Sequence, residues 1–222
     1  MSDAITKLNL EFRESKAHGG SWLWPNDDTV AWSYLNKAAH RHLPHKISQF
    51  CDRKSLVIQA GGNAGLYPKQ YASLFQQVIT IEPDYRNFFC LCYNVPDANV
   101  FKFQACLGDS NKMLGLDYNP RWNNENRGAM KVSSSGIIPQ ITIDSFNLAP
   151  DLIHLDIEGY EGFALNGAID TITKHKPLIV LETNGSGDEY GWPQNKIDEL
   201  LFSLGYKILE NWGHDTVYKN ET

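Results

Sequence analysis

The hydrophobic positions of this chain form short apolar runs that alternate with stretches of helical spacing. Apolar runs of strand length lie at residues 56–58, 78–81, 100–105, 152–157 and 177–183. Stretches with apolar residues at helical spacing lie at residues 30–39, 68–76, 87–94, 160–174 and 195–204. Two final runs, at 206–210 and 216–218, suit a closing antiparallel pair. Because strands alternate with helices, we predict an α/β fold with a doubly wound, mostly parallel sheet.

The chain before this alternating pattern is less regular. Residues 1–17 are polar and show no periodicity, so we expect no stable element there. We expect residues 1–50 to form an N-terminal extension whose helix packs on the core, and residues 51–222 to form the main domain.

One long segment inside the main domain also lacks a clean period. Residues 110–143 are rich in Asn and Gly at their start, and the irregular part is too long for an ordinary connection. We therefore expect a lid-like insertion, with residues 130–134 and 137–143 paired as a hairpin at its end.

The loop after the first strand of the main domain has the features of a nucleotide-binding turn. Gly61 permits a tight turn, Gly62 and Gly65 permit close backbone approach, and Asn63 tolerates left-handed backbone angles. Glu82 ends the next strand, 21 positions after Gly61 (82 − 61), close to the ~20-residue spacing of a ribose-binding acid. The loop does not supply Gly-x-Gly-x-x-Gly, so its spacing disfavours a dinucleotide.

The end of the third strand gives further candidates for cofactor contact. In a nucleotide-binding sheet of this kind, that strand passes beside the adenine. We therefore expect Cys106, Leu107 and Asp109 to lie next to the adenine ring.

A second chemical stretch lies at residues 151–161, where polar groups interrupt a buried strand. His154, Asp156 and Glu158 share one strand face if the strand extends that far. Buried charges are costly unless they are paired or functional, and the carboxyl end of a parallel strand opens into the ligand crevice. These residues are therefore candidate catalytic groups. The alternative is structural, with Asp156 capping the next helix.

Composition narrows the function further. The net charge of −6 and the absence of a basic stripe argue against a nucleic-acid partner. Four cysteines without paired spacing indicate free thiols rather than a zinc site, and we expect no bound metal. The N-terminus does not resemble a secretory leader and no apolar run is long enough to span a bilayer, so we expect a cytoplasmic protein without a membrane partner.

Three groups of segments carry a resemblance to a known family. They are VIQAGGNAGLYP with TIEPD, then TIDSF, then LIHLDIEGYEGFALNGA with PLIVLET. The sequence resembles the FkbM family of S-adenosylmethionine-dependent methyltransferases, whose sheet is Rossmann-like. The resemblance implies that S-adenosylmethionine is the cofactor, held by Gly61, Asn63, Gly65 and Glu82, and that Asp156 and Glu158 lie at the methyl-transfer site.

The resemblance also implies a reaction, the methylation of a hydroxyl group on a sugar or similar small-molecule or glycan acceptor. Asp156 is the first choice for the base, and His154 and Glu158 are the alternatives. Family members usually carry an acid that helps to hold the cofactor where this chain has Gln59, and often a Lys where it has His154. Gln59 is thus a candidate cofactor contact. Because it replaces the family's acid, a second hypothesis stays open, namely a module that retains the fold without catalysis.

A remote third reading is a non-haem iron oxygenase. His154 and Asp156 with the distal His214 resemble a ligand set of two histidines and one carboxylate. That set usually belongs to an all-β jelly roll, whereas the pattern here is βαβ.

Overall fold

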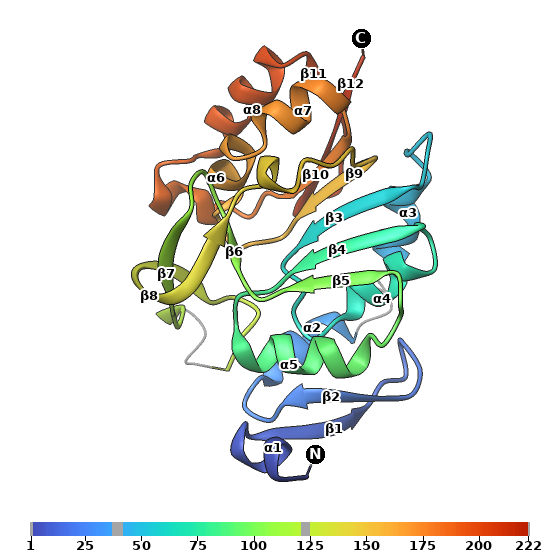
Figure 1. Cartoon of the computed structure of the whole chain (residues 1–222), viewed down its shortest axis with the longest axis vertical. Helices are drawn as coiled ribbons and strands as arrows, with labels where there is room; N and C mark the ends of the chain where they lie inside the picture. The colour runs from blue at the N-terminus through green and yellow to red at the C-terminus, as the bar shows by residue number, and fades with distance from the viewer. Residues whose placement is uncertain (1, 37–41, 121–124, 222) are drawn as a thin grey trace.

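Within residues 2–36, 42–120 and 125–221, which the computed structural model describes, a seven-stranded sheet forms the centre of the protein (Figure 1). Its strands are β3 (Leu56–Ala60), β4 (Gln77–Ile81), β5 (Val100–Phe103), β9 (Leu152–Leu155), β10 (Leu178–Glu182), β11 (Tyr206–Asn211) and β12 (Asp215–Asn220). Their order is β11-β12-β10-β9-β3-β4-β5. The strands from β10 to β5 are parallel, and β12 is antiparallel to both β10 and β11. This confirms the predicted mostly parallel sheet with an antiparallel closing pair.

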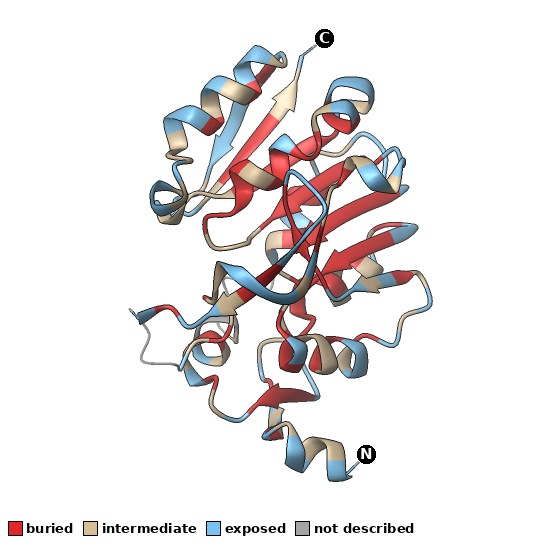
Figure 2. Cartoon of the chain, turned by 60° about the vertical axis from the view of Figure 1, so that its left-hand side comes forward, coloured by how far each residue is buried: buried red, intermediate tan, exposed pale blue. Residues whose placement is uncertain are grey.

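Helices cover both faces of this sheet. On one face lie α3 (Leu43–Ser48), α4 (Leu66–Ala72) and α5 (Tyr85–Asn94), and on the other lie α6 (Glu161–Asn166), α7 (Ile169–His175) and α8 (Gln194–Ser203). Successive residues of each central strand pack against opposite helical layers: Val57 faces α4, and Ile58 faces the second layer. The central strands are therefore buried on both faces, as Figure 2 shows in red, which is why they read as continuous apolar runs.

One of the predicted helices is interrupted in the structure. The single helix expected at 160–174 is two helices, α6 and α7, separated at Gly167. A Cβ atom at Gly167 would lie 2.0 Å from the carbonyl oxygen of Gly108, so a glycine is required where these backbones meet. Two short 3-10 helices cover Asp144–Phe146 and Ser186–Tyr190. No helix in the described part of the chain is both long and apolar enough to cross a membrane.

The insertion supplies two of the three strands of a separate small sheet. Strands β6 (Cys106–Leu107), β7 (Lys112–Asp117) and β8 (Lys131–Ile141) are ordered β6-β8-β7. The expected hairpin between 130–134 and 137–143 is wrong, because these residues form the single strand β8, which pairs with β7. The register shifts between Leu114 and Gly115. A Cβ atom at Gly136 would lie 2.3 Å from the carbonyl oxygen of Leu114, so the two strands approach closely at that point.

The N-terminal segment is more ordered than its polar sequence suggests. It contains α1 (Ser2–Lys7), β1 (Leu10–Glu14), β2 (Ser21–Pro25) and α2 (Thr29–Leu35). The expectation that residues 1–17 lack structure is therefore wrong. The helix expected at 30–39 is described as far as Leu35, and its last positions lie outside the described residues. Strands β1 and β2 pair as an antiparallel ribbon below α5 in Figure 1.

Aromatic and apolar side chains attach this segment to the main domain. Leu23 and Trp24 are fully buried and belong to one apolar cluster with Leu66 of α4 and Cys90 of α5. Trp22 belongs to the same cluster. The tryptophans of β2 thus serve packing here rather than forming a wall of the cavities described below.

His154 belongs to the core, not to the surface of a crevice. Its side chain is fully buried, its ring stacks on Tyr67 at 5.7 Å between centroids, and its Nδ1 shares a hydrogen bond of 2.8 Å with the hydroxyl of Tyr71. Strand β9 ends at Leu155, so the alternation that was expected to place His154, Asp156 and Glu158 on one face does not continue. The grouping of His154 with the two acids is therefore wrong.

Burial of His154 predicts a stability change in acid. Burial lowers the pKa of His154 to about 4 from its usual value near 6.5. The unfolded chain therefore binds one more proton between those values, and stability is lost as the pH falls from about 6.5 to 4. The free energy of unfolding should drop by roughly 3 kcal/mol more in the wild type than in His154→Gln, which keeps an acceptor for Tyr71 but does not titrate. Urea unfolding at pH 7, 5.5 and 4 measures this. Parallel loss in both proteins would contradict it.

Candidate active site

A cleft lies at the carboxyl-terminal edge of the parallel strands. Its larger cavity has a volume of about 390 Å³ and is lined at the strand ends by Gly61, Glu82, Asp156 and Glu182. A smaller cavity of about 50 Å³ shares Gly61, Glu82 and Asp156 with it. Because open α/β sheets bind ligands at this edge, the two adjoining cavities are the candidate active site.

The glycine loop after β3 lies directly against the end of β9. Gly61 has φ +82°, and a Cβ atom there would lie 1.8 Å from the carbonyl oxygen of Asp156. The amide groups of Gly61 and Gly62 both donate to the carbonyl of Ile81, each at 3.0 Å. Only glycine fits at Gly61, so this residue determines how closely the loop approaches the neighbouring strands. Asn63 follows with φ +45°, in the left-handed region that the sequence predicted for it.

Glu82 connects the loop to the end of β4. Its Oε2 accepts from the amide of Asn63 at 2.7 Å, and its Oε1 accepts from the amide of Asp84 at 2.8 Å. Only 5% of the residue is exposed, and burial, followed by the charge of Asp84, raises the pKa of Glu82 to about 8. When Glu82 is ionised, each oxygen still has a free lone pair, so it can accept two more hydrogen bonds from a ligand in the cavity.

Gln59 supports the loop from beneath and lines neither cavity. Its Nε2 donates to the carbonyl oxygens of Ala60 and Gly61, both at 3.0 Å, and its Oε1 accepts from the Thr80 hydroxyl at 2.6 Å. The side chain is fully buried. An acid at this position could not donate to the two carbonyls, so the amide of Gln59 is matched to this loop, and the expected direct contact with a cofactor does not follow from its position.

The candidate adenine neighbours divide into two groups. Cys106 and Leu107 are buried and line the smaller cavity, where burial raises the pKa of the Cys106 thiol to about 12 and keeps it neutral. Asp109 lies outside both cavities; its Oδ1 accepts from the Ser110 hydroxyl at 3.0 Å and pairs with Lys112 at 3.7 Å. The smaller cavity is therefore an apolar slot next to Glu82, and Asp109 is not part of its wall.

Three carboxyl groups converge at the ends of β9 and β10. Asp156, Glu158 and Glu182 each place one carboxylate oxygen within 4.8 Å of the others. Sequence reasoning missed Glu182, although the available signal, an acid at the end of an apolar strand, is the same one that identified Glu82. The alternative role of Asp156 as a helix cap is wrong, because α6 has no side-chain N-cap and the amide of Ile157 is instead bonded by Glu161 at 2.9 Å.

The three acids share a weakly solvated environment that favours their neutral forms. Burial raises the pKa of Asp156, burial together with the charge of Asp156 raises that of Glu158 to about 8, and the same two causes raise that of Glu182 to about 12. Neighbouring carboxyl groups cannot all ionise at low cost, so protons are shared among them at neutral pH. A carboxylate oxygen set of this kind suits a positively charged ligand or a hard divalent cation such as Mg²⁺.

The iron ligand set proposed from the sequence does not assemble. Asp156 and His214 both line the larger cavity, but His154 does not, since it is buried against α4. The three side chains therefore cannot hold one ion, and the parallel α/β sheet is not a jelly roll.

Part of the wall of the larger cavity is made of polar residues, of which the sequence singled out only His214. They come from the insertion, from the segment after β10 and from the start of β12: Asn119, Asn126, Asn184, Ser186, His214 and Asp215. Burial raises the pKa of Asp215 to about 7. These residues are distant in sequence and have no shared motif, so only the fold identifies them as one surface.

The sequence and the fold were compared with those of known proteins. Residues 59–208 match the profile of the methyltransferase FkbM domain. No curated protein sequence gives a significant match. Among solved structures, the FkbM methyltransferase from Methylobacillus flagellatus KT superposes with a TM-score of 0.50 and 21% identity, covering 77% of this chain and 44% of that one. This chain thus spans less than half of the length of that structure.

Two further structures show the same fold at lower identity. Magnesium protoporphyrin IX methyltransferase from Synechocystis PCC 6803, with S-adenosylmethionine bound, has a TM-score of 0.51 at 8% identity over 87% of this chain and 85% of that one. Trm5b from Pyrococcus abyssi has a TM-score of 0.50 at 14% identity over 95% and 54%. The profile covers well over half of the 222 residues and includes the glycine loop, Glu82 and the acidic strand ends. The chain therefore belongs to the FkbM family of S-adenosylmethionine-dependent methyltransferases.

Proposed function

We propose that this methyltransferase methylates a hydroxyl oxygen of a sugar or a similar small, polyhydroxylated acceptor. The observation that carries the proposal is the position of Asp156, which lines both the smaller and the larger cavity. A carboxyl group at this junction can face the reacting end of the cofactor and the acceptor at the same time.

The residues of the smaller cavity and the loop fit S-adenosylmethionine. Glu82 offers two free lone pairs to the ribose hydroxyls, and Cys106 and Leu107 offer an apolar wall to the adenine. The carboxyl groups of Asp156 and Glu158 lie close together, so the positive charge of a ligand next to them is favourable. When bound, the cofactor supplies a methyl group on a positively charged sulfur, and the C–S bond electrons remain on that sulfur after transfer.

Asp156 is the base in this proposal. The Asp156 carboxylate would take the proton of the acceptor hydroxyl as that oxygen is methylated, so the proton would stay on the protein. The raised pKa of Asp156 makes it a stronger base than an exposed aspartate. Glu158 and Glu182 lie close enough to exchange that proton with Asp156.

The polar wall supports an acceptor rich in hydroxyl groups. Asn119, Asn126, Asn184 and Ser186 present amide and hydroxyl groups that both donate and accept hydrogen bonds. The acidic cavity and the net charge of −6 disfavour a nucleic-acid acceptor. All four cysteines are free, which fits the reducing cytoplasm that we infer as its location.

Incubation with methyl-labelled S-adenosylmethionine and fractionated cell glycans and small metabolites tests the proposal. Mass spectrometry should find the label as a methyl ether on a hydroxylated small molecule or glycan, and Asp156→Asn should serve as the inactive control. Label found instead on nucleic acid or protein, or on nitrogen, would overturn the assignment of the acceptor.

Replacement of the proposed base should affect turnover much more than cofactor binding. Asp156→Asn keeps the shape of the side chain but cannot accept the proton, so turnover should fall at least about a hundred-fold while affinity for S-adenosylmethionine changes little. Single-turnover kinetics and calorimetry measure the two quantities. Asp170→Asn, an exposed substitution on α7, is the control. Near-normal turnover of Asp156→Asn would remove Asp156 as the base and make Glu158 the next variant to examine.

Replacement of Glu82 should weaken cofactor binding rather than slow the chemical step. Glu82→Gln presents an N–H group to one of the two backbone amides that Glu82 now bonds, and it removes the charge that attracts the ribose hydroxyls. A hydrogen bond to a charged group contributes roughly 1.5–3 kcal/mol, so affinity should fall about ten-fold or more. Calorimetry with S-adenosylmethionine, compared with exposed Glu199→Gln on α8, provides the measurement. Unchanged affinity would place the ribose elsewhere.

A further inference from the structure

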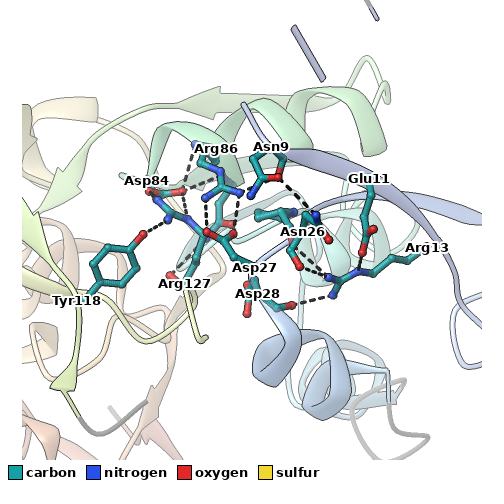
Figure 3. A network of polar contacts seen from close by, with 12 residues as sticks. Asn9, Glu11, Arg13, Asn26, Asp27, Asp28, Asp84, Arg86, Tyr118 and Arg127 are labelled. Atoms are coloured by element: carbon teal, nitrogen blue, oxygen red, sulfur yellow. Dashed lines mark hydrogen bonds and ion pairs between the residues drawn. The ribbon is translucent and has the colours of Figure 1, made fainter. Parts of the chain in front are cut away.

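Arg127 lies on the insertion and reaches into the main domain beside the cofactor cavity. It is 5% exposed and lines the smaller cavity. Its Nε donates to Oδ1 of Asp84 at 3.2 Å, its Nη2 donates to Oδ2 of the same carboxylate at 2.5 Å, and its Nη1 donates to the hydroxyl of Tyr118 (Figure 3). A buried arginine with two bonds to one carboxylate is thus built into the wall of the site.

Asp84 connects Arg127 to Glu82 through a hydrogen bond of its backbone. The backbone amide of Asp84 donates to Oε1 of Glu82 at 2.8 Å, while the Asp84 carboxylate also accepts from the amides of Arg86 and Asn87 at the start of α5. Arg127, Asp84 and Glu82 therefore form a continuous series of contacts. It runs from the insertion, through the helix cap, to the acid that faces the two cavities.

Without Arg127, this series of contacts would hold two buried acids and no positive charge. Glu82 and Asp84 are 5% and 3% exposed, and buried acids two positions apart repel each other. The charge of Asp84 raises the pKa of Glu82, and the charge of Arg127 lowers it. Besides Arg127 and Asp84, the titratable groups that line the two cavities with Glu82 are mostly acids and phenols, and only His214 among them is basic. They are Asp156 and Glu158 in both cavities, Tyr67, Glu182, His214 and Asp215 in the larger one, and Cys106 and Tyr160 in the smaller one.

We propose that Arg127 is a positioning residue for the cofactor: it neutralises Asp84 and so makes it easier for Glu82 to ionise and accept hydrogen bonds from the ribose hydroxyls. The inference rests on the proposed contact between Glu82 and the cofactor. It gives the insertion a role in cofactor affinity that does not require contact between Arg127 and the acceptor.

A second arginine on the other side of Asp84 is a matched control. Arg86 is 5% exposed and bonds both carboxylate oxygens of Asp27 at 2.8 and 2.7 Å, which attaches the N-terminal segment to α5 (Figure 3). It does not line either cavity. Loss of Arg86 therefore removes a comparable ion pair without changing the charge next to Glu82.

Calorimetric binding of S-adenosylmethionine between pH 6.5 and 9.5 tests the role of Arg127. Glu82 accepts best when ionised, so wild-type affinity should rise with pH through about 8. In Arg127→Met the pKa of Glu82 rises further, so binding should be about ten-fold weaker at pH 7, the rise should move to higher pH, and the difference from wild type should narrow at pH 9.5. Arg86→Met should lose stability but keep the wild-type pH midpoint.

A double substitution separates the effect of charge from simple support of the loop. Arg127→Met with Asp84→Asn removes both charges, so it should recover most of the affinity lost at pH 7 by Arg127→Met alone. If Arg127→Met does not fold, Asp84→Asn alone gives the test: asparagine still caps α5, and the rise in affinity should move to lower pH than in the wild type.

Specific results would overturn the inference. An Arg127→Met protein with the wild-type pH midpoint, a double variant as weak as the single one, or an unshifted midpoint in Asp84→Asn would show that Arg127 does not act through charge on Glu82. In those cases wild-type binding and the proposed reaction stand. Absence of wild-type binding at every pH would instead overturn the cofactor assignment itself, and this inference with it.

Discussion

Two backbones lie close together at the centre of the candidate active site. The glycine loop after β3 meets the end of β9 where Gly61 faces the carbonyl of Asp156, with no room for a side chain. This contact brings the cofactor-type loop and the acidic strand end to a common wall. A side chain at Gly61 would separate them, and Asp156 would no longer line both cavities.

Burial of carboxyl groups is the second constraint on this site. The ends of β4, β9 and β10 each carry an acid, Glu82, Asp156 and Glu182, and burial raises the pKa of all three. Such a site is costly to build without positive charge. In the proposed reaction, a cofactor with a positively charged sulfur would supply part of that charge, and the raised pKa of Asp156 would suit it to remove a hydroxyl proton. The same burial that costs stability thus prepares the site for its reaction.

Segments outside the central sheet complete the site through arginine–aspartate pairs. Arg86 with Asp27 attaches the N-terminal segment to α5, and Arg127 with Asp84 attaches the insertion to the end of β4. Both arginines bond both oxygens of their partner, an arrangement that holds orientation as well as distance. The N-terminal segment and the insertion are therefore both tied to the start of α5, where Asp84 lines the smaller cavity.

The sequence by itself determined the alternation of strands and helices in the central sheet, the position of the glycine loop, and the acids Glu82 and Asp156. Local signals suffice for these features, because apolar period, glycine tolerance and a strand-end acid all act within one βαβ unit. The directions of two polar side chains in the central strands became known only from the tertiary structure. His154 and Gln59 point to the α4 side of the sheet, because the pleat of each strand determines the face on which a residue lies. Glu182 and Arg127 reach the site from distant parts of the chain, and only the packing of parallel strands and the insertion brings them beside Glu82 and Asp156.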